Sequence, residues 1–273
     1  MARLSKAQRQ SRIVQELRTT SHLRIADLAE HFEVSTETIR RDLEELSQEG
    51  LVSRAYGGAL SRRAMAVQPA FGEREQASVN ERWRIGELVA SLVAPGEVLM
   101  VDSGATTTQF ARSLAAQQKA STVLTNSLSI ALALGESEGA RVILCPGDFS
   151  PGENGVYGPD TLDFLRRFRA NKAILGASAI DVDGVMDVNS AAAWVKRTMM
   201  EKADETLLLV DSSKFGQRRL EIVSPLNAVD ALITDAEPGP ELMKALTDSG
   251  TRVLVADPDA IAATAPEPRN LRQ

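Results

Sequence analysis

Short apolar runs alternate with amphipathic stretches along most of the chain after residue 80. The runs predict buried strands, and apolar residues spaced three or four positions apart predict helices between them. We expect strands at 98–101, 123–125, 142–145, 173–175, 207–210, 231–233 and 253–255. We expect helices at about 80–93, 107–116, 128–134, 161–167, 192–202 and 241–249. This alternation is typical of an α/β domain with an open, mainly parallel sheet and helices on both faces.

The first 60 residues follow a different pattern. A helix is expected from Ser5 to about Thr19, and a short amphipathic helix follows around residues 25–32. After a tight turn at 33–35, apolar residues at positions 39, 43 and 46 form one stripe of another helix, for which Ser35 is a suitable N-cap. Residues 51–58 read as a small β-hairpin. Two short helices, a turn, a further helix and a hairpin predict a small winged helix-turn-helix domain.

Paired arginines near the start of the third helix are the first sign of a binding surface. Arg40 and Arg41 fall outside the apolar stripe, and Gly57-Gly58 would let backbone approach a phosphate closely. Taken alone, the arginines could form a solvated helix face and the glycines an ordinary turn. Their order and spacing near the N-terminus together favour DNA binding.

The segment VSTETIRRDLEELSQEGLVSRAYGGA, residues 34–59, resembles the DNA-binding signature of the DeoR family of bacterial sugar-metabolism repressors. The turn, the TIRRDL core and the R-x-x-GGA wing occur in register. The resemblance implies a double-stranded DNA operator as partner. It implies DNA contacts from Ser35, Thr36, Thr38, Arg40, Arg41, Arg54, Tyr56, Gly57 and Gly58.

At 273 residues the chain is long enough for about two domains. We assign residues 1–60 to the winged helix-turn-helix and residues 61–78, with Pro69 and Gly72, to a linker. We expect residues 79–257 to form the α/β domain, to which the family resemblance gives effector sensing and oligomerisation, and residues 258–273 to form a C-terminal tail.

Charge distribution reconciles DNA binding with the net charge of −6. Residues 1–63 hold 11 Lys and Arg against 9 Asp and Glu, a balance of +2, whereas residues 64–273 hold 20 against 28, a balance of −8. Attraction to phosphates depends on the local basic cluster more than on total charge.

Several features favour a cytoplasmic protein. No run of about 18 apolar residues predicts a membrane span, and no hydrophobic N-terminal segment suggests a signal peptide. The single cysteine, Cys145, allows no internal disulfide and follows an apolar run, which favours a buried small side chain.

Polar loops follow four of the predicted strands, at 102–107, 125–127, 146–158 and 211–216. Ligands of parallel sheets bind beyond the carboxyl ends of the strands. Glycine, hydroxyls and free amides at a helix start form an anion site, although ordinary helix capping explains the first loop equally well. Lys196 and Lys214 could reach the same crevice, and each alone would more often be solvated.

The segments VDSGATTT, LTNSL, ILGASAID, VKRTMM and VDSSKFG resemble the effector domain of the DeoR family. The resemblance implies the fold of the ribose-5-phosphate isomerase group, a phosphorylated sugar or polyol as effector, and a homo-oligomer, either dimer or tetramer. It implies effector contacts from Asp102, Ser103, Gly104, Ala105, Thr106, Thr107, Asn126, Ser127, Gly147, Lys196, Asp211 and Lys214.

Four positions depart from the family pattern within this presumed pocket. Ala105 stands in place of a usual hydroxyl residue, Pro146 and Ala179 in place of glycines, and Ala192 in place of a glutamate. The departures leave the repressor interpretation intact and bear on which effector is bound.

Three function classes are compatible with these patterns. The first is a repressor of a sugar or polyol catabolic operon that a phosphorylated effector releases from DNA. The others are an aldose–ketose isomerase with a DNA-binding head, and a DNA-binding scaffold without a small ligand. Both histidines, His22 and His31, lie in the head, so the α/β domain lacks an imidazole base. The sequence favours the repressor, with no catalytic residue, metal or cofactor.

Overall fold

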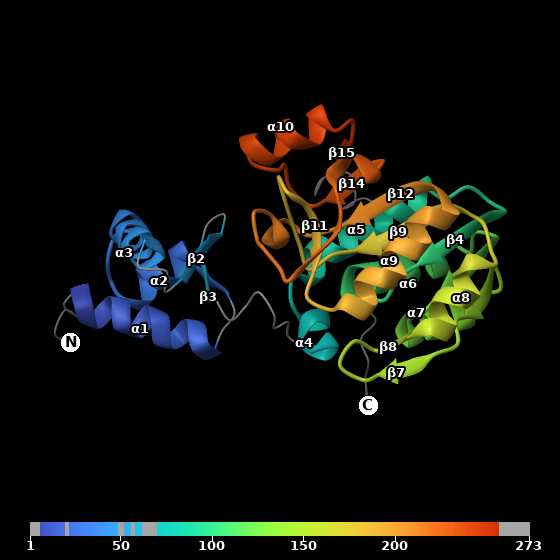
Figure 1. Cartoon of the computed structure of the whole chain (residues 1–273), viewed down its shortest axis with the longest axis horizontal. Coiled ribbons are helices and arrows are strands. Elements are labelled where there is room, and N and C mark those ends of the chain that lie inside the picture. The colour runs from blue at the N-terminus through green and yellow to red at the C-terminus, as the bar shows by residue number, and fades with distance from the viewer. Residues whose placement is uncertain (1–5, 20–21, 49–51, 56–57, 62–69, 257–273) are drawn as a thin grey trace.

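The computed structural model describes residues 6–19, 22–48, 52–55, 58–61 and 70–256. Figure 1 shows a small N-terminal domain in blue, followed along the chain by a larger α/β domain. The expected C-terminal tail, residues 258–273, lies outside the described residues. No helix among the described residues is both long and apolar enough to cross a membrane.

The N-terminal domain combines three helices with a small antiparallel sheet. The helices are α1 (Lys6–Thr19), α2 (Ile25–His31) and α3 (Thr36–Gln48). The strands are β1 (His22–Arg24), β2 (Val52–Ala55) and β3 (Gly58–Ser61), in the order β1-β3-β2. The predicted hairpin is therefore present and longer than expected, and it is joined by β1, a strand that the sequence pattern did not reveal.

A compact apolar cluster holds the three helices together. Its buried members are Ile13, Leu28, Ala29, Phe32, Ile39, Leu43 and Leu46. Ile39, Leu43 and Leu46 form the apolar stripe predicted for α3. The turn between α2 and α3 passes through Glu33, whose φ of 51° is left-handed. Ser35 caps α3, since its Oγ accepts the amide hydrogen of Thr38 at 3.2 Å.

The stretch expected to be a linker contains a further helix, α4 (Phe71–Gln76). Phe71 is buried, and its amide donates to the carbonyl of Gly152 at 2.9 Å. This end of the stretch is therefore attached to the α/β domain. Residues 62–69 lie outside the described residues.

Seven parallel strands form the sheet of the larger domain, in the order β15-β14-β12-β9-β4-β5-β6. In chain order they are β4 (Glu97–Val101), β5 (Ser121–Thr125), β6 (Ala140–Leu144), β9 (Ala170–Gly176), β12 (Ala203–Leu209), β14 (Ala231–Thr234) and β15 (Arg252–Val255). Each corresponds to a predicted strand, so the expected α/β fold is confirmed.

Helices cover both faces of this sheet. The cluster with Ile85, Phe110 and Ile130 packs one face under α5 (Val79–Leu92), α6 (Ala105–Ala116) and α7 (Leu128–Gly135). The cluster with Leu165, Met199 and Leu246 packs the other under α8 (Pro159–Arg166), α9 (Ser190–Lys202) and α10 (Pro240–Asp248). Both faces are thus sealed from water, and polar residues gather at the strand ends.

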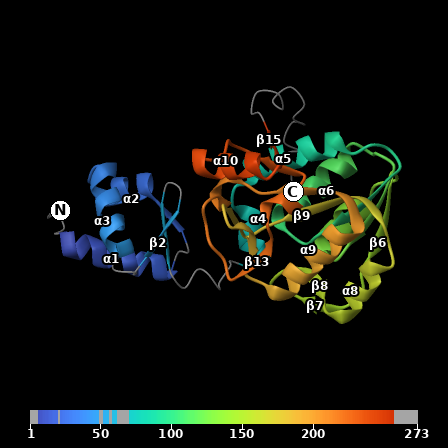
Figure 2. The same ribbon diagram turned by 45° about the horizontal axis from the view of Figure 1, so that its top comes forward.

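Short additional strands surround the carboxyl end of the sheet. A hairpin of β7 (Asp148–Ser150) and β8 (Gly155–Tyr157) lies beside α8, as Figure 2 shows. A three-stranded antiparallel sheet joins β10 (Ala179–Asp181), β11 (Gly184–Asp187) and β13 (Glu221–Ser224). Two single-turn helices, η2 (Ser212–Lys214) and η3 (Leu226–Ala228), complete the domain. The sequence pattern did not predict these short elements.

Candidate functional site

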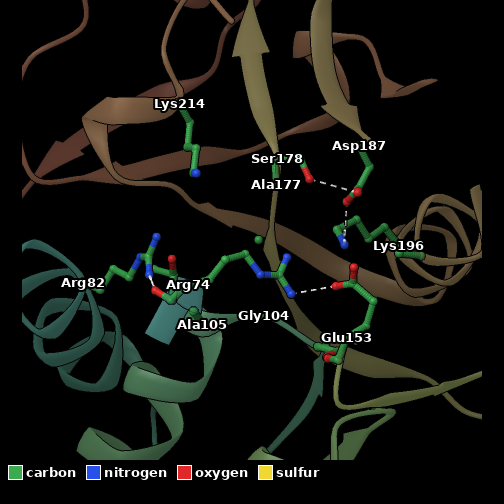
Figure 3. A pocket seen from close by; sticks show the side chains of 14 residues that line it. Arg74, Arg82, Gly104, Ala105, Glu153, Ala177, Ser178, Asp187, Lys196 and Lys214 are labelled. Atoms are coloured by element: carbon green, nitrogen blue, oxygen red, sulfur yellow. Dashed lines mark hydrogen bonds and ion pairs between the residues drawn. The ribbon is translucent and has the colours of Figure 1, made fainter. Parts of the chain in front are cut away.

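A pocket opens at the carboxyl ends of β4 and β9, between the start of α6 and helix α9 (Figure 3). The space between its lining atoms amounts to about 490 Å³ when the part open to solvent is included. Its lining combines four cations, two carboxylates and a group of small residues. These are Arg74, Arg82, Lys196, Lys214, Glu153, Asp187, Ser103, Gly104, Ala105, Thr106, Gly176, Ala177, Ser178 and Ala192.

Helix α6 points its N-terminus at the pocket. Its N-cap residue, Gly104, supplies no side-chain hydrogen bond to the first turn. The hydroxyls of Thr107 and Thr108 donate backward, to the carbonyls of Asp102 (2.8 Å) and Gly104 (2.7 Å). The first amides of α6 are therefore left for a ligand, at the positive end of the helix. This arrangement suits an anion.

A buried ion network forms one side of the pocket. Lys196 Nζ lies 2.5 Å from Asp102 Oδ2 and 3.1 Å from Asp187 Oδ2. Asp102 also accepts the amide hydrogen of Gly176 at 2.8 Å, and Asp187 accepts the hydroxyl of Ser178 at 3.0 Å. These contacts join β4, β9, β11 and α9.

Burial and charge act against each other in this network. Burial raises the pKa of Asp102 above its ordinary value, and Lys196 opposes that rise only in part. Burial acts in the same direction on Asp187, but Lys196 and the amide of Asn189 hold its pKa below the ordinary value. Burial would lower the pKa of Lys196, but the two carboxylates raise it. Lys196 is therefore a fixed cation, with Asp187 its ionised partner facing the pocket.

A second cluster lies across the pocket. Arg82 Nε donates to Asp211 Oδ2 at 3.1 Å, and both side chains are buried. Asp211 keeps a pKa below its ordinary value because Lys214 and Arg82 outweigh the effect of burial. Burial, opposed by Asp211, lowers the pKa of Lys214. Lys214 makes no ion pair among the described residues, and Figure 3 shows its ammonium directed into the pocket.

A third ion pair crosses the pocket from α4. Arg74 lies 2.6 Å from Glu153 Oε2 (Figure 3). The carbonyl of Glu153 accepts the hydroxyl of Ser103 at 2.7 Å. Glu153 stands in the turn between β7 and β8, so this turn is tied to both α4 and the loop that starts α6.

Half of the predicted effector residues line this pocket and half support it. Ser103, Gly104, Ala105, Thr106, Lys196 and Lys214 line it. Asp102 and Asp211 lie behind it, paired with cations, and Thr107 bonds back to the Asp102 carbonyl. Buried carboxylates pair with cations because an unpaired buried charge is costly.

The three remaining predicted residues shape the loops. Asn126 is buried; its side chain accepts the amide of Ser103 at 3.0 Å and donates to the carbonyl of Val156 at 3.1 Å. Ser127 caps α7. Gly147 has a φ of 143°, and a Cβ there would collide with Thr161 and the Tyr157 carbonyl. These residues position the pocket without lining it.

Several lining residues were not predicted from the sequence: Arg74, Arg82, Glu153, Gly176, Ala177, Ser178 and Asp187. Glu153 lies in the polar loop predicted at 146–158, and Ser178 in the ILGASAID segment. Arg74 and Arg82 precede the first strand of the sheet, where no motif marked them. Of the four family departures, Ala105 and Ala192 line the pocket, whereas Pro146 and Ala179 do not.

The predicted DNA-contacting residues of α3 share one exposed region. Ser35, Thr36, Arg40 and Arg41 are exposed, and Thr38 is half-buried. The side chain of Arg41 is 77% exposed and 3.7 Å from Glu37. Arg54 lies in β2 and Gly58 begins β3, but the side chain of Arg54 is not described. Tyr56 and Gly57 lie outside the described residues.

The described residues support neither a metal site nor a reactive cysteine. Among the described residues, no group of three or more His, Cys, Asp or Glu is placed to hold a metal ion. Cys145 is buried as predicted, and burial raises the pKa of its thiol to about 12, which leaves it protonated.

The chain matches two family models. Residues 9–64 match a DeoR-like helix-turn-helix domain, and residues 77–236 match a DeoR C-terminal sensor domain.

The chain is also similar to curated transcriptional regulators over most of its length. It is 34% identical over 246 residues to the glycerol-3-phosphate regulon repressor of Escherichia coli K12, covering 90% of this chain and 97% of that protein. It is 35% identical over 248 residues to the uncharacterized HTH-type transcriptional regulator YulB of Bacillus subtilis, covering 90% and 95%. Among solved structures, ribose 5-phosphate isomerase A of Methanocaldococcus jannaschii is 16% identical with a TM-score of 0.38, covering 51% of this chain and 55% of that one.

Proposed function

The chain belongs to the DeoR family of transcriptional repressors, and from that premise we propose that its pocket binds a phosphorylated sugar or polyol that releases the repressor from its operator. The regulated genes would serve the catabolism of that sugar or polyol. The name of the relative in Escherichia coli points to a glycerol-3-phosphate regulon, and this supports a short phosphorylated polyol as a first candidate.

The observation that carries this proposal is the uneven distribution of charge in the pocket. On one side Lys214 is free of ion pairs among the described residues, and Arg82 and the N-terminus of α6 line the same pocket. A phosphate on this side would accept hydrogen bonds from amides, from Lys214 and from an arginine, all of which are strong donors to a charged acceptor.

The opposite side of the pocket suits hydroxyl groups. Asp187 and Ser178 provide acceptors, and Lys196 provides a donor that its two carboxylates keep charged. Ala105, at the N-terminus of α6, and Ala192, on α9, leave the pocket lining without the hydroxyl and carboxylate that the family pattern would supply. The proposed effector therefore differs in its substituents from the usual effectors of the family.

For the DNA side, we propose that α3 enters the major groove and that the β2–β3 wing contacts the backbone. The exposed arginines at 40 and 41 support this, because both lie outside the buried stripe of α3. We propose that the α/β domain holds two or four copies together, that the protein acts in the cytoplasm, and that the pocket senses its ligand without transforming it.

A melting experiment tests the proposed function. The purified protein is heated with a panel of phosphorylated sugars and short polyols, including glycerol 3-phosphate, and with the same compounds lacking phosphate. At about 100 times its Kd, a true effector should raise the Tm of the α/β domain by roughly 5 °C or more. An operator obtained by selection from random DNA should then lose affinity for the protein when that compound is added.

Two results would contradict the proposal. If the unphosphorylated compounds gave the same Tm rise, the anion side of the pocket would have no role in recognition. If no compound raised the Tm while operator binding was intact, the chain would be a DNA-binding scaffold without a small effector. Conversion of a panel compound into its isomer would support the enzyme alternative.

A further inference from the structure

Helix α4 lies between the pocket and the DNA-binding domain along the chain. It begins at Phe71, so residues 62–70 separate it from the end of β3 at Ser61. A shift of α4 would therefore move Phe71, where the segment that leads to the DNA-binding domain is attached to the α/β domain.

Residues of the pocket hold α4 in place. Arg74 of α4 pairs with Glu153 at 2.6 Å. The guanidinium of Arg82 donates to the carbonyl of Arg74, at the end of the same short helix. Arg74, Arg82 and Glu153 all line the pocket. The attachment of α4 is thus built from the same side chains that a ligand would meet.

The turn that carries Glu153 adds a second link. The carbonyl of Gly152 accepts the amide of Phe71 at 2.9 Å, and the carbonyl of Glu153 accepts the hydroxyl of Ser103 at 2.7 Å. Ser103 lines the pocket just before the α6 N-terminus. A displacement of this turn would therefore move both Phe71, the first residue of α4, and Ser103 on the anion side of the pocket.

An anion in the pocket and the Arg74–Glu153 pair oppose each other. Glu153 places a negative charge in the pocket, which repels a phosphate, and it pairs with a guanidinium that a phosphate can also bind as a bidentate partner. The ligand and Glu153 thus compete for the guanidinium of Arg74, and Glu153 is the partner that holds α4 against the α/β domain.

From these contacts we propose that α4 is the coupling element of the protein: the ligand withdraws Arg74 from Glu153, loosens α4 from the α/β domain and so changes the position of the DNA-binding domain. This inference rests on the proposed function, since it takes the pocket ligand to be a phosphorylated compound. Arg74 would then have two roles: it binds the ligand, and through its release from Glu153 it transmits ligand binding to α4.

The chain offers a matched control. Glu75 of α4 pairs with Arg112 of α6 at 2.9 Å, and neither residue lines the pocket. This pair is more exposed than the Arg74–Glu153 pair, with 51% of the Arg112 side chain accessible. Arg112→Gln therefore removes an ion pair to α4 without altering the pocket.

Hydrogen–deuterium exchange on the full-length protein provides the first arm of the test, without ligand. Glu153→Gln and Arg74→Gln should each speed exchange of the amides of residues 71–77 by about threefold or more, because a local opening loses one of its closing contacts. Arg112→Gln should change this exchange much less. If both pocket variants exchanged like wild type, α4 would not be held by the pocket and the inference would be overturned.

The second arm adds glycerol 3-phosphate and ribose 5-phosphate, with inorganic phosphate as the minimal probe. A probe that raises the Tm should speed exchange of residues 71–77 in wild type and add little in Glu153→Gln. If a probe raised the Tm but left this exchange unchanged, the coupling role of α4 would fail while the proposed function stood. If no probe raised the Tm, the proposed function would fail, and this inference with it.

Discussion

Lys214 is the cation that the pocket leaves available to a ligand. Arg74, Arg82 and Lys196 each have a carboxylate partner, whereas Lys214 has none within ion-pair distance among the described residues. We therefore expect Lys214→Met to weaken binding of a phosphorylated effector by about 1.5–3 kcal/mol, roughly tenfold or more in Kd. Calorimetric titration checks this value.

Lys244→Met is the matched control for that substitution, because Lys244 is exposed on α10 and pairs with Asp248 within its own helix. It should leave the Kd unchanged. Equal Kd values for wild type and Lys214→Met would remove Lys214 from the binding site.

The same lysine should make effector binding sensitive to alkaline pH. Burial, together with Arg82, Arg219 and Arg74, lowers the pKa of Lys214, and Asp211 only partly opposes this. Only the protonated form attracts phosphate, so affinity should fall as pH rises, at lower pH than for a solvated lysine. Titrations between about pH 7 and 10 measure this fall, which Lys214→Met should abolish. A fall of equal size in that variant would assign the titration to another group.

Arg41 is the residue by which the DNA interface can be tested. Its side chain is 77% exposed near the start of α3, where base edges can be reached. Arg41→Ala should weaken operator binding by about 1–3 kcal/mol if the contact is to a base. Fluorescence anisotropy with the selected operator measures the loss, and Arg252→Ala, an exposed arginine of the α/β domain, serves as control. Unchanged affinity of a folded Arg41→Ala protein would contradict the assignment.

At the scale of elements, the DNA-binding domain depends on a buried ion pair between α1 and α3. Arg9 Nε lies 2.5 Å from Asp42 Oδ2, and the two side chains are only 10% and 2% exposed. Asp42→Ala would leave Arg9 buried without its partner, at a cost of about 3–5 kcal/mol. We expect the N-terminal domain of this variant to unfold at a much lower temperature, seen as a separate early transition in calorimetry.

The neighbouring Lys6–Glu45 pair gives the contrast. Its side chains are 56% and 44% exposed, so water screens the pair and Glu45→Ala should destabilise the domain much less than Asp42→Ala. If the two variants destabilised the domain equally, burial of the Arg9–Asp42 pair would not be the cause.

The main elements could be predicted because their signals are local. Each central strand, such as 98–101 or 207–210, is an apolar run long enough to stand out, and the α3 stripe repeats at a helical period. Strands β1, β10 and β11 have only three or four residues and depend on partners distant in sequence, as in the pairing of β1 with β3. Helix α4 is six residues long and is held by Glu153, which no local pattern could indicate.

The pocket was predictable in part for the same reason. Residues 103–106 and Lys214 follow strands directly, so their position in the chain places them at the ligand edge. Arg82 reaches that edge from a helix before the first strand, through a pair with Asp211 that lies 129 positions away. Asp102 and Asp211 were expected to contact the ligand. In the structure each carboxylate is buried and pairs with a cation, Asp102 with Lys196 and Asp211 with Arg82.

For the whole molecule, the charge distribution leads us to expect that operator binding uses more than one DNA-binding domain. Residues 1–63 carry a balance of only +2, and the remainder carries −8. One such domain can neutralise few phosphates, and the acidic remainder is repelled by DNA. Specific binding therefore should need two domains on repeated half-sites, held by contacts between α/β domains.

Sedimentation and operator spacing test this last expectation together. The protein should sediment as a dimer or a larger oligomer at the concentrations that bind DNA. The selected operator should contain repeated half-sites whose centres are about one helical turn, or a multiple of it, apart. Inserting about half a turn of DNA between the half-sites turns one of them to the opposite face, and should abolish most of the affinity that the second domain contributes. A point substitution in one half-site should also weaken binding at both, because the two domains bind as a linked pair. A monomer that binds a single half-site with full affinity would contradict this assembly, and α4 would then regulate one domain alone.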